Sequence, residues 1–208
     1  MKTLHRMLIR DLRSLSMQAI TIALVIAAGT AAFIATMSTH SSLQRARDDY
    51  YREARFADLF VRLHRAPIAM AGSFEELPGV AAVHTGLAFA ARLEIPGLSD
   101  LISGRLMDLP PSAVNAISLR AGRWPEQGSL EVLLGEAFAV RRGLGPGDSL
   151  KAVINGKEQS LLIVGVASSP EYLIGVGEGG MADDRSFALV WMDRDRLAAA
   201  FDMTGAFN

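Results

Sequence analysis

The side chains that could do chemistry are few and scattered in this sequence. The four histidines are His5, His40, His64 and His84, and no two of them have the i, i+4 spacing of a helical zinc site. The chain has no cysteine, which excludes a disulfide framework, a thiolate metal site and a cysteine nucleophile. We therefore expect no metal and no other cofactor, and we interpret the histidines as surface or hydrogen-bonded core residues.

Two further patterns resemble chemical sites. The glycine-rich stretch GVGEGG, Gly175 to Gly180, lacks the G-x-x-x-x-G-K-[ST] pattern of a phosphate loop and is not followed by a helix-forming segment. The carboxylate pairs Asp48-Asp49 and Asp183-Asp184 are most simply solvated charges of a stalk or a loop. No Walker-type motif occurs in the chain, so any ATP must be bound elsewhere. The sequence predicts that this chain is not an enzyme, for want of a convergent catalytic set.

The overall charge narrows the range of partners. The 208 residues carry 21 basic and 22 acidic side chains, a formal net charge of -1. A nucleic-acid partner is not expected, because such proteins usually show a basic surplus on one face. The composition is 50% hydrophobic, and the excess lies near the N-terminus.

One long apolar stretch could be a membrane span, a signal peptide or a core helix. Ala19 to Met37 reads AITIALVIAAGTAAFIATM, and no charged residue occurs between Ser14 and Leu43. A membrane-spanning helix needs roughly 20 apolar residues, whereas a signal peptide has an apolar region of about 7–15. A core helix of a soluble domain would show a polar face. We therefore predict a retained transmembrane helix over residues 16–39.

The charges beside this helix predict its orientation. The basic residues before it are Lys2, Arg6, Arg10 and Arg13, with Asp11 as the only acid. The stretch after it is mixed in sign. The positive-inside rule therefore places the N-terminus in the cytoplasm and the chain from about Ser41 onward outside.

Residues 1–15 have a pattern of their own. The leucines Leu4, Leu8, Leu12 and Leu15 follow helical spacing, with the basic residues on another side. The simpler interpretation is an amphipathic helix at the membrane interface on the cytoplasmic side. The alternative is a surface that docks a cytoplasmic partner.

Small residues recur within the apolar stretch. The alanines at four-residue intervals are Ala19, Ala23, Ala27, Ala31 and Ala35. Such a stripe lets helices approach closely in lipid, and an isolated anchor does not need one. We favour a face that packs on other spans, the alternative being a plain consequence of an alanine-rich composition.

The region outside the membrane is predicted to be a mixed α+β domain. Residues 40–56 are helix-forming and polar and continue the span as a stalk helix, and residues 57–208 form the domain. The predicted strands cover residues 57–63, 87–95, 101–107, 150–154, 161–167 and 187–192. The stretch LEVLLGEAFAVRRGLGPGDS predicts one more strand, a short helix and a Gly/Pro turn. Further helices are predicted at 67–77 and after an N-cap at Asp193. Asn155-Gly156 predicts a two-residue hairpin turn.

A longer stretch of this domain resembles a known family. It runs from Ala116 to Leu173 and includes Gly122-Arg123-Trp124-Pro125, a Gly143 to Leu150 turn and a Val164 to Val166 strand. Together with the N-terminal layout it resembles the FtsX-like permeases of bacterial ABC transporters, with a MacB-type periplasmic core domain. These motifs are structural and carry no catalytic residues.

The resemblance implies a location and partners. Members of that family sit in the bacterial inner membrane, with the domain periplasmic or extracellular and at least four spans. A separate or fused ATPase binds the cytoplasmic face and drives the outside domain through the stalk. Members export peptides or drugs (efflux), extract lipoproteins or lipids, or regulate cell-wall enzymes. This implies as partners an ABC ATPase subunit, other spans of the same or a second permease, and a periplasmic protein.

Two functional hypotheses follow. In the first, this chain is the N-terminal portion of a permease, with Leu4 to Leu15 facing the ATPase. In the second, it is a single-pass anchored binding or adaptor module, as the lack of a second span before Asn208 favours. In either case Trp124 and Tyr172 are candidates for an extracytoplasmic contact surface.

Overall fold

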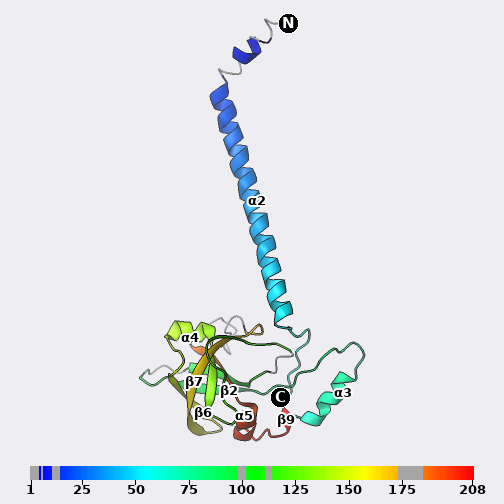
Figure 1. Cartoon of the computed structure of the whole chain (residues 1–208), viewed down its shortest axis with the longest axis vertical. Coiled ribbons are helices and arrows are strands. Elements are labelled where there is room, and N and C mark those ends of the chain that lie inside the picture. The colour runs from blue at the N-terminus through cyan, green and yellow to red at the C-terminus, as the bar shows by residue number, and fades with distance from the viewer. Residues whose placement is uncertain (1–4, 6, 11–14, 98–101, 111–113, 173–184) are drawn as a thin grey trace. The chain divides into compact units, whose positions relative to one another are not determined.

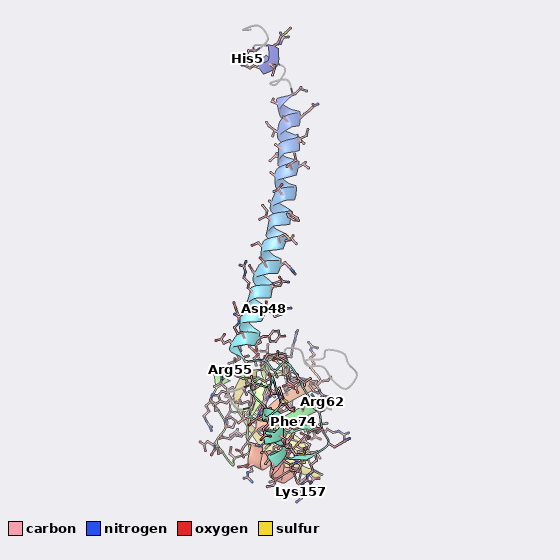
Figure 2. The ribbon with its side chains drawn as sticks, turned by 90° about the vertical axis from the view of Figure 1, so that its right-hand side faces the viewer. His5, Asp48, Arg55, Arg62, Phe74 and Lys157 are labelled. Carbon is pink, nitrogen blue, oxygen red and sulfur yellow. The ribbon has the colours of Figure 1, made fainter. Side chains whose placement is uncertain are left out.

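A long helix dominates the N-terminal part of the chain. The computed structural model describes all residues except 1–4, 6, 11–14, 98–101, 111–113 and 173–184. Helix α2 runs without interruption from Ser16 to Glu53, and none of its residues is buried (Figures 1 and 2). It is the one helix of the described residues that is long and apolar enough to cross a membrane. The lack of any buried residue in its apolar part argues against a core helix of a soluble domain.

Hydroxyl groups inside the apolar stretch are satisfied within the helix. Thr21 Oγ1 donates to the carbonyl of Met17, and Thr36 Oγ1 donates to the carbonyl of Ala32, each at 2.9 Å. These bonds to the preceding turn let a polar side chain lie in an apolar environment. The stretch is therefore compatible with lipid along its length.

The last residues of α2 and the chain after it fold as a unit that extends from Tyr51 to Asn208. Its elements, in chain order, are β1 (Ala66–Pro67), the 3-10 helix η1 (Ile68–Met70), α3 (Ala71–Glu75), β2 (Ala88–Glu94), β3 (Ile102–Asp108), β4 (Ser118–Gly122), β5 (Glu131–Gly135), α4 (Glu136–Arg142), β6 (Ser149–Ile154), β7 (Lys157–Ser168), β8 (Phe187–Met192), α5 (Arg194–Ala200) and β9 (Ala206–Phe207).

The main sheet has the order β4-β7-β5-β8-β3-β2-β6, and β6 also pairs with β7. The strand β7 is long enough to pair with three neighbours. Residues 157–162 of β7 pair with β6, and the second half of β7 pairs with β5 and β4. The strands from β7 through β5, β8, β3, β2 and β6 therefore form a closed ring of pairings, which leaves few unpaired edges. Figure 1 shows β2, β6 and β7 side by side in this ring.

Each strand of this ring contributes buried apolar side chains to one core. Leu93, Leu106 and Val190 are among its fully buried members. Helices α4 and α5 add Phe138 and Leu197 to the same core. A smaller cluster on the other face of the sheet includes Leu133 and Trp191. Alternate residues of β5 and β8 thus serve two apolar clusters, as expected for strands covered on both faces.

Most predicted elements are confirmed. Helix α2 continues from the predicted span into the predicted stalk and ends at Glu53. Asn155 and Gly156 both have positive φ (47° and 76°) and connect β6 to β7 directly, as a two-residue type I′ turn requires. The side chain of Asp193 caps α5 by accepting from the amide of Arg196.

The prediction of a strand at residues 57–63 is wrong. This stretch lies in neither a helix nor a strand. Its composition favours a strand, but a strand also needs a hydrogen-bonded neighbour, and no described segment pairs with it. Sequence reasoning also missed β4 and the small β1–β9 ribbon, and it began the strand β7 at Leu161 instead of Lys157.

Candidate functional site

A hydrogen-bonded joint fixes the chain where α2 ends. The carbonyls of Ala54 and Arg55 accept hydrogen bonds from the amides of Ala116 and Asn115, at 2.9 and 3.1 Å. The side-chain Oδ1 of Asn115 accepts a third bond from the amide of Ala57 at 2.9 Å. Ala54 and Arg55 follow directly after the end of α2, and these bonds satisfy carbonyls that would otherwise need water. We call residues 54–57 and 115–116 the joint.

The backbone of the joint is held in an uncommon conformation. Arg55 and Asn115 both have positive φ, 50° and 51°. Asparagine tolerates this region better than most residues, and the Asn115 side chain is also buried and hydrogen-bonded. Ala54 is 7% exposed, so the joint is packed as well as bonded.

Aromatic rings support the same joint. Tyr51 and Phe56 lie with their ring centroids 4.7 Å apart, and Phe56 and Phe60 follow at 5.4 Å. Contacts of this geometry add to the stabilisation that burial provides. These rings pack the chain just after α2 against the last turn of that helix, while the hydrogen bonds to Asn115 and Ala116 hold residues 54–57 to the domain.

The loop after β4 is braced by the ion pair of Arg123 and Glu131. Both guanidinium Nη atoms of Arg123 donate to the carboxylate of Glu131, and Oε2 of that carboxylate also accepts from the amide of Glu126 at 2.9 Å. The hydrogen bond from Arg123 lowers the pKa of Glu131. This two-point geometry folds the loop back onto the start of β5.

Gly122 permits the close approach that this loop needs. It has a φ of 79°, and a Cβ placed on it would lie 2.2 Å from the carbonyl oxygen of Val164. Any other residue would clash with the backbone of β7 and would be strained as well. The G-R-x-P stretch of the sequence is thus a structural brace.

A buried carboxylate lies at the end of β3. Asp108 is 5% exposed; its Oδ1 accepts from the amide of Leu87 at 2.8 Å, and its Oδ2 pairs with Nη1 of Arg194. The same Nη1 donates to the carbonyl of Thr85 at 2.7 Å. Arg194 is the first residue of α5, so the pair connects β3 to α5 across 86 positions of sequence.

His84 lies beside this ion pair. Burial lowers its pKa and outweighs the opposing effect of the Asp108 charge, while Arg194 lowers it further. Burial also raises the pKa of Asp108, although the Leu87 amide and Arg194 act against that shift. The pair and its hydrogen bonds to the backbone connect β3, the residues before β2 and α5, which is a structural role.

A small cavity lies on the sheet face opposite the main core. Its volume is about 210 Å³, and its lining includes Phe138, Ser169, Tyr172, Phe187 and Trp191. Burial raises the pKa of Tyr172, and its hydroxyl oxygen lies 3.4 Å from Nη1 of Arg105. Trp124, the other predicted contact residue, is 48% exposed in the loop after β4. The role of Trp124 and Tyr172 in an extracytoplasmic contact stays a prediction.

The remaining predicted site residues lie on the N-terminal part of the chain. The alanines of the stripe all face outward from α2, and so does Leu8 from the short helical stretch before it. Leu15 is also exposed. Leu4, Leu12, Gly175 to Gly180 and Asp183-Asp184 lie outside the described residues. No group of histidine and carboxylate side chains able to hold a metal occurs in the part of the chain that the structure describes.

Sequence reasoning missed the residues that make the joint and the buried pair. Asn115 lies in an irregular stretch with no recognisable signal, and its partner Ala57 is 58 positions away. Asp108 follows a predicted strand, and an acid there is usually solvated. Only its position opposite the first residue of α5 reveals its role.

The chain matches a protein family over nearly its whole length. The sequence model of the MacB-like periplasmic core domain matches residues 19–206. No curated protein matches the chain significantly.

Solved structures show distant similarity. The extracellular domain of the noncanonic ABC-type transporter YknZ from Gram-positive bacteria is 14% identical, with a TM-score of 0.45 over 69% of this chain and 70% of that one. The periplasmic region of MacB from Actinobacillus actinomycetemcomitans is 12% identical, with a TM-score of 0.42 and coverages of 68% and 61%. A domain of a putative permease from Porphyromonas gingivalis is 16% identical, with a TM-score of 0.42 and coverages of 66% and 55%.

Proposed function

This chain belongs to the MacB-like periplasmic core domain family, and from that premise we propose that it transmits motion in an ABC transporter permease. In this proposal a partner ATPase hydrolyses ATP on the cytoplasmic side. The displacement passes along α2, and the outside domain moves in response. The chain itself carries out no chemical step.

The observation that carries this proposal is the continuity of α2 into the joint. The helix has 38 residues, which corresponds to about 57 Å at 1.5 Å per residue. A continuous hydrogen-bonded helix is stiff along its axis, and three further hydrogen bonds hold its C-terminal end to the segment at Asn115. That segment leads directly into β4, a strand of the main sheet. A shift of the helix end is therefore applied to the sheet.

Several features of the N-terminal part acquire roles in this proposal. Residues 1–15 lie in the cytoplasm and present Leu4, Leu8, Leu12 and Leu15 to the ATPase. Residues 16–39 cross the bacterial inner membrane, and the alanine stripe packs on other spans of the permease. Residues 40–56 are the stalk, and 57–208 the domain outside. The cargo would be a peptide, a drug or a lipid-linked substrate exported or extracted from the membrane, and the domain would meet a periplasmic partner.

The orientation can be tested directly because the chain has no native cysteine. His5→Cys and Lys157→Cys place single thiols at exposed positions before and after α2, both labelled in Figure 2. A membrane-impermeant maleimide should label the Lys157→Cys variant once the outer membrane is permeabilised, and the His5→Cys variant only after lysis of the inner membrane. The reverse pattern would place the domain in the cytoplasm and overturn the proposal.

The partner ATPase is tested by co-purification from detergent-solubilised membranes. An ATP-binding subunit should accompany the wild-type chain and be lost with Leu8→Asp, which places a charge on the apolar side of the first helix. Arg10→Gln, on another side of the same stretch, should retain the subunit. If no ATPase accompanies the wild type, the single-pass binding module becomes the better explanation.

A further inference from the structure

The cavity beside Trp191 has no role in the proposed function. It lies between β8, the end of β7 and the start of α4, which is labelled in Figure 1. Its lining is mainly apolar and includes the aromatic side chains of Phe138, Tyr172, Phe187 and Trp191. An apolar, aromatic lining with a few polar groups is typical of a pocket for a small organic molecule. We call it the Trp191 cavity.

The volume of the Trp191 cavity limits the size of its occupant. An apolar protein cavity of about 150 Å³ is large enough to hold benzene. The Trp191 cavity is larger, at about 210 Å³, which leaves room for a short substituent on such a ring. It is smaller than the pockets of about 300–1,000 Å³ that bind most drug-sized ligands. A single aromatic ring with a short side chain is therefore the occupant that fits.

Arg105 brings a positive charge to this face of the sheet. It is the Cα partner of Leu189, a lining residue, in the parallel pairing of β3 with β8, so the two side chains project from the same face. Its Cζ lies 5.7 Å from the ring centroid of Tyr172, and its Nη1 lies 3.4 Å from the hydroxyl oxygen of that residue. Arg105 therefore meets the cavity where Tyr172 lines it.

The guanidinium of Arg105 is half-buried and forms no ion pair with a described carboxylate. Two acids border the cavity. Glu136 is paired with Nε of Arg120 at 3.3 Å. Glu171, whose charge acts on the Tyr172 hydroxyl, is exposed, so water weakens its effect. A half-buried cation that lacks a paired acid favours an anionic partner, and a planar guanidinium matches a carboxylate in particular.

Ser169 supplies a further hydrogen-bond donor. It lines the cavity and is 4% exposed. Its Oγ accepts from the amide of Glu171 at 3.3 Å, and no described acceptor takes the hydrogen of its own hydroxyl. A buried hydroxyl usually has a partner for that hydrogen, and an oxygen atom of a ligand would provide one.

We propose that the Trp191 cavity binds a small aromatic carboxylate, with its ring among the aromatic side chains and its carboxylate paired with Arg105. The apolar walls select the ring, the volume limits it to one ring, and the guanidinium selects the negative charge. This site goes beyond the proposed function and does not depend on it.

Trp191 can report binding directly. In a Trp124→Phe background it is the single tryptophan of the chain, and it lines the cavity. We expect titration of this full-length chain in lipid nanodiscs with 3-phenylpropionate to change the Trp191 fluorescence saturably. The neutral probe 3-phenylpropanamide has the same ring and chain length. It should bind about tenfold more weakly, because it cannot form an ion pair with Arg105.

Arg105→Gln tests the charge that selects the carboxylate. The Kd for 3-phenylpropionate should rise about tenfold, whereas the Kd for the amide should change by less than about twofold. Arg92→Gln is the matched control, because Arg92 is an exposed arginine of the same sheet, on β2, and does not line the cavity. This variant should leave both Kd values unchanged.

Ala137→Phe tests the location of the site. Ala137 lies in the first turn of α4, lines the cavity and is exposed, so a larger side chain can be accepted there without overpacking the core. The added ring should take up the space of the ligand and abolish the response to both probes. Thermal unfolding like that of the parent chain verifies that the variant is folded.

Other outcomes would overturn the proposal. A parent chain without a saturable response would show that the cavity does not take this ligand, and equal affinities for the acid and the amide would show that charge does not select it. Equal effects of Arg105→Gln and Arg92→Gln, or unchanged binding by Ala137→Phe, would place the ligand elsewhere. None of these results depends on an ATPase or on the orientation in the membrane, so this proposal and the proposed function can fail separately.

Discussion

Asn115 accepts a hydrogen bond from Ala57 through its side chain and donates one to the carbonyl of Arg55 through its own amide. One buried residue thereby clamps both sides of the turn that ends α2. The backbone of Asn115 itself has a positive φ of 51°. If motion passes from α2 into the sheet, this residue lies on its route.

The clamp is tested by Asn115→Ala. The change leaves the amide of Ala57 without its acceptor and places alanine in a strained conformation, so we expect the free energy of unfolding to fall by about 2–4 kcal/mol. Asn155→Ala is the matched control, because Asn155 has a similar φ of 47° but is exposed in the β6–β7 hairpin. In this variant the free energy of unfolding should fall only by the cost of backbone strain, about 1–2 kcal/mol. Chemical denaturation measures both, and equal losses would exclude a special role for the Asn115 side chain.

The buried ion pair is tested by Arg194→Met. The substitution keeps the apolar stem but leaves the Asp108 carboxylate unpaired, and we expect a loss of about 2–3 kcal/mol. This is less than for a fully buried pair because 29% of the Arg194 side chain is exposed. Asp108→Asn/Arg194→Met should recover part of the loss, since the amide oxygen still accepts from Leu87 without a buried charge.

Tryptophan fluorescence can report these unfolding transitions. Trp191 is 3% exposed and Trp124 is 48% exposed, so a Trp124→Phe background leaves one buried probe in the core. The ion-pair prediction fails if Arg194→Met unfolds like the wild type, or if the double variant is as unstable as the single one.

The pH dependence of stability should report His84. Its lowered pKa means that the folded domain binds this proton less readily than the unfolded chain, so stability falls as pH drops below about 6.5 toward the folded-state pKa. Asp108 acts in the opposite direction at lower pH, because its raised pKa makes the folded state bind a proton more readily. His84→Gln should therefore flatten the decrease between neutral and mildly acidic pH.

The control for this measurement is His40→Gln, at an exposed position on α2. Its unfolding curves should follow those of the wild type at every pH. A His84→Gln variant with an unchanged pH profile would show that folding does not lower the pKa of His84.

The alanine stripe is tested by adding bulk on two sides of α2. Ala27→Leu lies at the centre of the stripe and should lower the yield of the assembled permease complex several-fold, because small residues set the approach of packed spans. Ala32→Leu makes the same change about 140° around the helix, at 100° per residue, and should be tolerated. Equal yields from the two variants would indicate that the stripe reflects composition alone.

Local signals were enough to predict much of the fold. The run from Ala19 to Met37 has to form a helix in lipid because its backbone groups must be satisfied within the segment. Asn155-Gly156 predicts a hairpin, because a type I′ turn needs positive φ at both central positions and Asn-Gly is a favoured pair there. Asp193 caps a helix through a bond three residues along the chain. Each of these features depends on neighbours close in sequence.

Pairings between distant residues were not predictable in this way. Residues 57–63 have the composition of a strand, yet they form none in the described domain, since no described strand pairs with them. The environments of the predicted contact residues also come from the fold alone, since Trp124 is exposed in a loop and Tyr172 lines a cavity.

The sequence by itself therefore determined the apolar helix, the α+β character of the domain, its turns and caps, and the family resemblance. Only the tertiary structure decided that β6 closes the ring against β7, that Asn115 clamps the end of α2, and that Asp108 is buried against Arg194. The physical reason is that helices, turns and caps are stabilised by groups a few residues apart. Ring closure and buried polar pairs depend on which distant groups the packed core leaves opposite each other.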